Sequence, residues 1–197
     1  MDAKVFVLAA LAAGVAIWAV LAYNRLAALR AGFRNAFAQI EVQLGRRLDL
    51  VPSLVGVARS YMEHERATLE AVIVARNLAT HAAQRACAAP GDLGAMQGLS
   101  QAVGMLADSI GRLMVVAEAY PELKADARMG ELAEEISGTE HRIAAARQAY
   151  NDAVTDYNLA IGVFPVSLVA GVFGFAPSPQ LNAAEIPARR EAVRVQY

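Results

Sequence analysis

The fold is decided by residues 23–54, YNRLAALRAGFRNAFAQIEVQLGRRLDLVPSL. Large apolar side chains recur there at intervals of three or four residues, at Leu26, Leu29, Phe33, Phe37, Ile40 and Leu44. This spacing is typical of an amphipathic helix that buries one face. The stretch therefore predicts one wall of a helical core, which other helices must complete.

A segment without charge precedes this stretch, in residues 5–23, VFVLAALAAGVAIWAVLAY. A membrane-spanning helix needs about 20 apolar residues, so the segment predicts a transmembrane helix behind a short N-terminus, residues 1–4. A cleaved signal peptide is the alternative reading. The apolar run is long for that role, and no convincing A-x-A cleavage site follows it.

The charges around this segment predict its orientation. Lys4 is the only basic side chain before the segment and is offset by Asp2, whereas three arginines follow closely, Arg25, Arg30 and Arg34. The positive-inside rule then places the rest of the chain in the cytoplasm. The formal net charge of −1 argues against a nucleic-acid surface. One cysteine, Cys87, excludes an internal disulfide and fits a small apolar residue near a helix end.

Helical patterns continue along the chain. We expect the transmembrane segment, residues 5–23, which we call the anchor, to form one continuous helical rod with the amphipathic helix after it. This rod should end or kink in RRLDLVP, residues 46–52, because Pro52 cannot donate a hydrogen bond to the carbonyl four residues back. Asp49 would then cap a second helix over residues 50–86, and Asp92 a third over residues 93–120. A fourth helix is predicted over residues 122–163. The fold class is therefore all-α, with an N-terminal transmembrane helix continuing into an up-and-down antiparallel four-helix bundle of long helices.

The C-terminal part has two predicted segments. Residues 164–175, FPVSLVAGVFGF, close the bundle domain of residues 24–175 and are too short to span a bilayer. They cap the bundle or lie in the membrane interface, with Phe164, Phe173 and Phe175 as the interfacial side chains. The tail, residues 176–197, contains three prolines and is predicted to be extended or disordered.

The chain resembles the bacterial LemA family over nearly all of residues 23–175. The resemblance rests on YNRLAALR, FAQIEVQLGRRLDLVPSL, YMEHERATLEAVIVAR, EAYPELKAD, ARQAYNDAVTDYN and FPVSLVAGVFGF, in this order. It implies a four-helix domain in the cytoplasm behind one inner-membrane helix, and no established enzymatic activity. Phe37 replaces a usual Trp, Ser53 a usual Asn, and Gly56 stands where a Glu is common, so an activity that needed that acid is in doubt here.

The titratable residues form no pattern typical of catalysis. Di-metal bundles use Glu-x-x-His, but Tyr61, Leu78 and Gly138 stand three residues before the histidines. Glu134 and Glu135 are adjacent and point about 100° apart on a helix. No phosphate loop or nucleophile motif occurs in the sequence. We therefore predict no catalytic, cofactor or metal site and no enzyme.

One polar pattern has two readings. Tyr150-Asn151 and Tyr157-Asn158 repeat after seven residues, so like residues share one helix face. Structurally, a buried asparagine fixes helix register. Functionally, the four residues form a polar strip that receives a partner.

We expect a membrane-anchored scaffold or adaptor that positions or senses a partner at the bacterial inner membrane. The partner is a protein or a second copy of the chain, and Gly14 with its alanine neighbours permits close packing of two anchors. The alternative is a membrane organisation or remodelling factor of the magnetosome-protein type, in which residues 164–175 insert at the interface.

Overall fold

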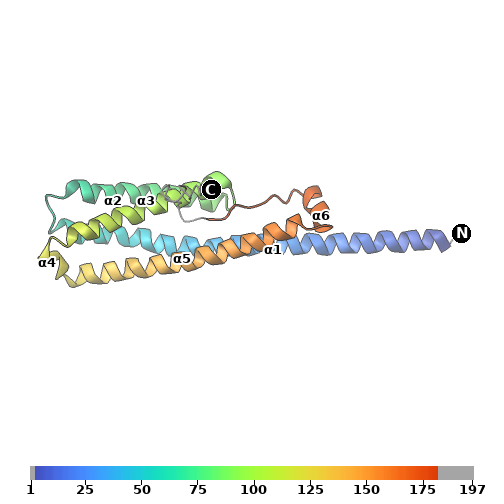
Figure 1. Ribbon diagram of the computed structural model, residues 1–197, viewed down its shortest axis with the longest axis horizontal. Coiled ribbons are helices and arrows are strands. Elements are labelled where there is room, and N and C mark those ends of the chain that lie inside the picture. The colour runs from blue at the N-terminus through green and yellow to red at the C-terminus, as the bar shows by residue number, and fades with distance from the viewer. Residues whose placement is uncertain (1–2, 182–197) are drawn as a thin grey trace, which may run out of the picture.

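Helices make up most of residues 3–181, the part of the chain that the computed structural model describes (Figure 1). They are α1 (Ala3–Arg59), α2 (Arg66–Ala88), α3 (Leu93–Ala117), α4 (Pro121–Lys124), α5 (Ala127–Gly162) and α6 (Val166–Val172). No strand occurs within the described range. The all-α prediction is confirmed.

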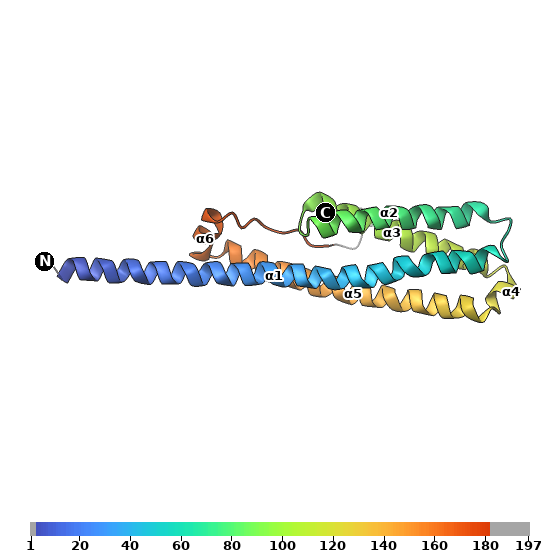
Figure 2. The ribbon, with the colours of Figure 1, turned by 180° about the vertical axis from the view of Figure 1, so that it is seen from behind.

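The four long helices lie side by side, and each runs opposite to the one before it (Figures 1 and 2). α1 packs mainly against α5 and also against α2, while α2 packs against α3. α3 and α5 meet only weakly, so one side of the bundle is less closed than the others. The short α6 contacts both α1 and α5 where the bare part of α1 begins.

α1 is one uninterrupted helix of 57 residues, which is about 86 Å at 1.5 Å per residue. Its first part projects beyond the other helices (Figure 1), and its large apolar side chains are exposed, Phe6 at 76% and Ile17 at 64%. By length and composition this helix is long and apolar enough to cross a membrane. α3 also passes that test, as do α5 and α6 taken as one bent pair, but α3 turns one face into the core.

The predicted end of the first helix at residues 46–52 is wrong. α1 passes through Pro52 and ends at Arg59, so Asp49 lies inside a helix and caps nothing. Pro52 does remove the donor for the carbonyl of Leu48, but the Nε of Arg76 replaces it at 2.9 Å. The second helix therefore begins at Arg66 and not near residue 50.

The predicted fourth helix is divided in two. α4 begins with Pro121, and α5 begins at Ala127 after the side chain of Asp126 accepts from the amides of Arg128 and Met129. The other predicted cap is present: Asp92 accepts from the amide of Ala95 at 2.8 Å at the start of α3. Short acceptor side chains at these positions satisfy amides that a helix start leaves free.

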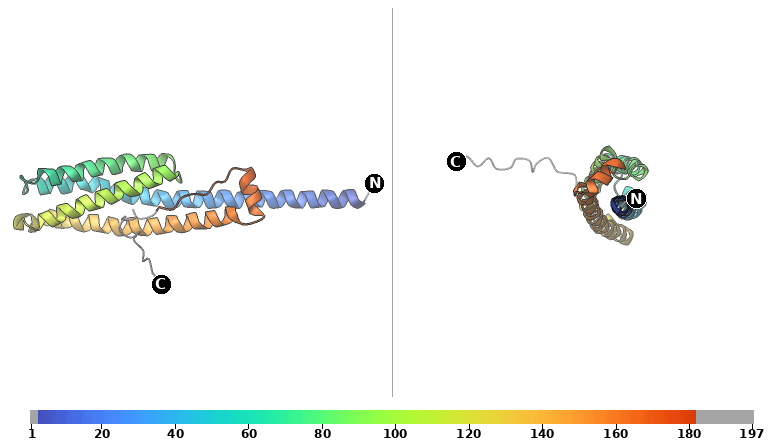
Figure 3. Two further views of the ribbon diagram at one scale, coloured as in Figure 1. Left: turned by 45° about the horizontal axis from the view of Figure 1, so that its top comes forward. Right: turned by 90° about the vertical axis from the view of Figure 1, so that its right-hand side faces the viewer.

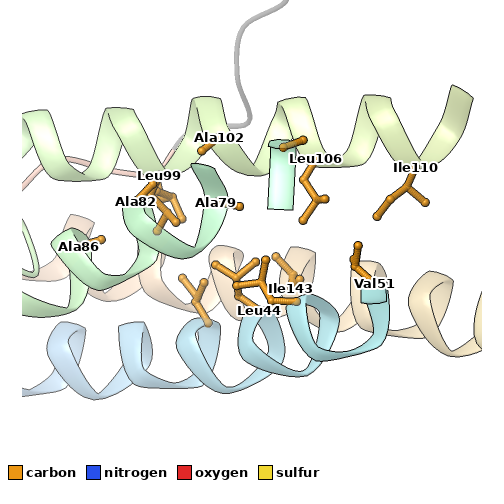
Figure 4. Packing of buried hydrophobic residues seen from close by; sticks show 14 of the residues in the cluster. Leu44, Val51, Ala79, Ala82, Ala86, Leu99, Ala102, Leu106, Ile110 and Ile143 are labelled. Atoms are coloured by element: carbon orange, nitrogen blue, oxygen red, sulfur yellow. The ribbon is translucent and has the colours of Figure 1, made fainter. Parts of the chain in front are cut away.

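The core runs along the bundle axis. Five of the six side chains in the predicted stripe of α1 are buried, and Leu29 is partly buried. Figure 4 shows Leu44 of α1 and Ile143 of α5 directed toward the same interior as Leu106 of α3. α2 contributes mostly small side chains to this interior, which allows α3 to approach it closely.

Candidate functional site: a strap and an apolar collar

The Tyr-Asn strip lies on one face of α5, and an extended segment of the same chain covers it. This segment, residues 176–181, is named the strap. Tyr150 and Tyr157 are buried beneath it, and their hydroxyls donate to the carbonyls of Pro179 at 3.0 Å and Ala176 at 2.9 Å. The strip therefore binds main-chain atoms rather than particular side chains.

Each asparagine of the strip pairs with one strap residue in both directions. The Oδ1 of Asn158 accepts from the amide of Ser178 at 2.9 Å, and its Nδ2 donates to the Ser178 carbonyl at 2.8 Å. Asn151 makes the same pair with Leu181, at 2.8 and 3.2 Å. A carboxamide carries one hydrogen-bond acceptor and one donor group. Each asparagine side chain therefore makes the two hydrogen bonds to the strap that a residue of a neighbouring strand would make in a β-sheet.

The spacing of the strip matches the spacing of the strap. Seven residues separate the two asparagines, which is about 10.5 Å along an α-helix. Three residues separate Ser178 from Leu181, which is about 10 Å in an extended chain. The distance between the two asparagines along the helix therefore equals the distance between their two partners along the strap. Because Asn158 pairs with Ser178 and Asn151 with Leu181, the strap runs antiparallel to α5.

Aromatic rings of α1 support the strip from below. The ring of Phe33 lies 5.2 Å from that of Tyr157 and 6.2 Å from that of Tyr150, and Phe37 lies 5.8 Å from Tyr150. Burial raises the pKa of Tyr150 and of Tyr157, because the phenolate would lose its hydration. Both hydroxyls therefore remain donors at neutral pH.

The strap also reaches the turn between α2 and α3. Gly91 in that turn has φ +91°, and a Cβ built on it would lie 2.5 Å from the Oγ of Ser178. The strap thus bridges the face of α5 that carries the Tyr-Asn strip and the turn between α2 and α3. Sequence reasoning placed residues 176–197 in an extended or disordered tail; residues 176–181 are extended and hydrogen-bonded, and residues 182–197 lie outside the described part.

The predicted interfacial segment forms α6 and its flanks beside the end of the exposed anchor (Figure 3). Phe173 packs edge-on against Tyr23 of α1, with ring centroids 4.9 Å apart. Phe175 lies 5.5 Å from the same ring, and the guanidinium of Arg30 lies 5.9 Å from the centre of the Phe175 ring. The side chains that remain exposed here are named the collar: Phe164, Leu168, Val172 and Phe173.

The family model described as LemA family matches residues 36–197. The chain belongs to the LemA family. The resemblance found in its motifs is thereby confirmed.

This LemA protein is also similar to three curated relatives over a shorter region. Magnetosome protein MamQ 2 and Magnetosome protein MamQ 1 of Paramagnetospirillum magneticum are each 34% identical to it over 85 residues. Magnetosome protein MamQ of Magnetospirillum gryphiswaldense is 33% identical over 85 residues. The aligned region is 43% of this LemA chain and 31% of each relative.

Two observations on titratable groups of this LemA protein bear on chemical reactivity. Within residues 3–181, no cluster of three His, Cys, Asp or Glu side chains is placed to hold a metal ion. Burial, followed by a hydrogen bond to Glu41, raises the pKa of the Cys87 thiol to about 11. Cys87 is therefore protonated at neutral pH, whereas a reactive cysteine is a thiolate.

Proposed function

We propose that this LemA protein is a membrane-anchored scaffold that holds a partner protein at a fixed height and orientation on the inner membrane of a bacterium. The observation that carries the proposal is the continuity of α1, which is an exposed apolar helix in its first part and a wall of the core in its second. A helix without a break transmits position, so the bundle cannot tilt independently of the anchor.

The bundle is assigned to the cytoplasmic side in this proposal. Arg25, Arg30 and Arg34 are exposed on α1 directly after the apolar segment, where positive charge disfavours translocation. The chain crosses the membrane once, through residues 5–23. It is not an enzyme in this role and needs no cofactor, and its partner is another membrane protein or a second copy of the chain.

The test breaks the rod without breaking the bundle. Four residues, Gly-Gly-Ser-Gly, are inserted between Leu21 and Ala22, near the end of the apolar segment and directly before Ala22, the first buried residue of α1. The matched control carries the same insertion after His64, an exposed residue in the connection between α1 and α2. Chemical crosslinking in intact membranes then compares both with the wild type.

We expect the wild type and the His64 control to recover the same crosslinked partner. The insertion at Leu21 should lose it while circular dichroism still reports a helical bundle. Recovery of monomer alone from wild-type membranes would overturn the scaffold role. An unchanged partner after the Leu21 insertion would overturn the requirement for a rigid rod.

A second function, membrane organisation or remodelling, is favoured by the collar. Phe164 is 75% exposed and Val172 is 80% exposed. The helix α6, which ends at Val172, lies beside α1 where the bare part of α1 begins (Figure 3). Apolar side chains at such a level are typical of insertion among lipid headgroups. The relatives are named magnetosome proteins, and a role in shaping a membrane compartment is the form that this function would take here.

Fluorescence quenching by brominated lipids tests the membrane contact of the collar. Phe173→Trp is made in a Trp18→Phe background and reconstituted in liposomes, with Val115→Trp on the exposed face of α3 as the control. We expect quenching at position 173 and none at position 115. Loss of liposome deformation in Phe164→Ser, seen by electron microscopy, would support remodelling, and an unquenched Trp at position 173 would exclude it.

A further inference from the structure

A groove of about 490 Å³ runs between α2 and α3 on the exposed side of this helix pair. Val74, Leu78 and Met105 line it, and each of these side chains is about half exposed. Ala67 and Ala71 add small side chains to the same lining, which permit another helix to approach closely. These five residues are named the α2–α3 face.

The composition of α3 exceeds what the bundle core requires. α3 is long and apolar enough to cross a membrane, but only 33% of its most apolar stretch is buried. Leu106 and Leu113 on one side of α3 are fully buried in the core, while Met105 lies in the groove outside it. Apolar side chains beyond the core face are typical of a helix that packs against a further partner.

Two residues of opposite charge flank the α2–α3 face, Glu70 on α2 and Arg112 on α3. Both are exposed, and neither forms an ion pair with any residue that the structure describes. Eighteen residues separate Glu70 from the end of α2 at Ala88, which is about 27 Å along the helix. Nineteen residues separate Arg112 from the start of α3 at Leu93, which is about 29 Å. Because a short turn joins these two antiparallel helices, the two charges lie at nearly the same level.

We propose that the α2–α3 face binds the same face of a second copy of this chain about a twofold axis. The inference rests on the proposed single-pass anchorage. Since both copies would cross one membrane in the same direction through residues 5–23, the axis lies along the membrane normal and so along the helices. α2 of each copy then lies opposite α3 of the other. Glu70 of one copy meets Arg112 of the other at the same level, and this ion pair occurs twice.

The larger apolar side chains match in the same arrangement. Leu78 lies ten residues, about 15 Å, from the end of α2, and Met105 lies twelve residues, about 18 Å, from the start of α3. Leu78 of one copy therefore meets Met105 of the other within about 3 Å of the same level. Apolar contacts with charged pairs beside them are typical of a protein interface. A twofold interface requires a surface that is complementary to itself, and the α2–α3 face with its two flanking charges meets this requirement.

Disulfide formation between two differently tagged copies tests the arrangement. Both full-length chains carry Cys87→Ser, one adds Leu78→Cys and the other Met105→Cys, and they are reconstituted together in liposomes. We expect mild oxidation to join the two tags, because the arrangement brings these positions within reach of a disulfide. In the matched control, Val42→Cys on the exposed surface of α1 replaces Leu78→Cys and should give roughly tenfold less product. Equal yields from the two pairs would overturn the proposal.

Charge reversal gives a second readout. Glu70→Arg and Arg112→Glu are made singly and together in the full-length protein, and light scattering in detergent measures the Kd of the dimer. Each single reversal places like charges opposite each other twice, so we expect the Kd to rise by about tenfold or more. The double variant exchanges the two charges and should return to within about threefold of the wild type. Glu131→Arg, at an exposed position of α5, is the control and should leave the Kd unchanged. Additive losses in the double variant would contradict the pairing.

Failure of this inference differs from failure of the scaffold role. The liposomes contain this chain alone, so they test the α2–α3 face without any other partner. If wild-type membranes yield a crosslinked partner of another kind and no disulfide joins positions 78 and 105, the shared face is overturned and the scaffold role stands. If that disulfide forms and the insertion after Leu21 leaves the dimer unchanged, the shared face is supported and the requirement for a rigid rod is overturned.

Discussion

The Nε of Arg76 in α2 lies 2.9 Å from the carbonyl oxygen of Leu48 in α1 and donates a hydrogen bond to it. This is the oxygen that Pro52, four residues later, leaves without its helical donor. A side chain from the next helix thus takes the place of a missing main-chain amide. The same hydrogen bond also links α2 to α1 at Leu48, where the main-chain hydrogen bonding of α1 is interrupted.

Removal of this donor should weaken the whole bundle. Arg76→Met leaves the Leu48 carbonyl unpaired in a part-buried position, and we expect a loss of about 1–3 kcal/mol in the free energy of unfolding. Pro52→Ala restores the main-chain donor, so Pro52→Ala/Arg76→Met should recover most of the loss. Chemical denaturation in detergent measures both. Strictly additive effects would contradict this role of Arg76.

The strap should open when its asparagine contacts are removed. In Asn151→Ala/Asn158→Ala, the amides of Ser178 and Leu181 lose their acceptors. We expect their hydrogen exchange to become roughly tenfold faster or more, since each lost bond contributes about 1 kcal/mol. Asn35→Ala, at an exposed position of α1, is the control and should leave exchange in the strap unchanged.

Two glycine substitutions should have opposite signs. Gly91→Ala forces a side chain into a backbone with φ +91° and against Ser178, so we expect a loss of about 1–2 kcal/mol. Gly111→Ala adds a methyl group in open space within α3 and should gain up to about 1 kcal/mol. Thermal unfolding of the two variants distinguishes them. A neutral Gly91→Ala would mean that the strap does not press on the α2–α3 turn.

The contribution of Asp126 should depend on pH at both ends of the scale. A hydrogen bond from Tyr61, then bonds from the amides of Met129 and Arg128, lower the pKa of Asp126. A lowered folded pKa means that the stabilisation is present above about pH 4 and is lost as pH falls through the folded value. The same hydrogen bond raises the pKa of Tyr61. Its stabilisation of the fold is therefore present below about pH 10 and is lost as the pH rises through the pKa of Tyr61 in the folded protein.

Comparison of the wild type with Tyr61→Phe measures this dependence. The difference in Tm between the two should be constant between about pH 5 and 9 and should shrink outside that range. A difference that persisted unchanged at pH 2.5 would show that the bond does not need the carboxylate.

The sequence predicted the parts of the fold that depend on local pattern. The stripe from Leu26 to Leu44 and the cap at Asp92 need only neighbours within a few residues. The passage of α1 through Pro52 could not be predicted in that way, because the compensating donor, Arg76, lies in another helix. The break at Asp126 had a local signal, an acidic residue able to cap the helix that follows it, which the prediction of one helix over residues 122–163 did not use.

The candidate site was predicted in part. The repeat of Tyr150-Asn151 at Tyr157-Asn158 identified the face of α5 that matters. It did not identify the strap, because the strap contributes main-chain atoms and no side-chain pattern of its own. The signal that could have identified it is a distance. Two asparagines about 10.5 Å apart on a helix are separated by the same length as three residues of an extended chain, and such a chain follows soon after the helix.

Because α1 continues without a break from the apolar first part into the core, it also fixes the rotation of the bundle about the axis of α1. Successive residues of an α-helix are rotated by about 100° about its axis, so the number of residues between Gly14 and Leu26 sets the rotation of the bundle relative to the apolar first part of α1. In the proposed scaffold, deletion of one residue there would leave the height of the bundle almost unchanged and would rotate the strap to another side. In the proposed scaffold role, the first part of α1 would therefore set the rotation of the bundle about the membrane normal as well as its height above the membrane.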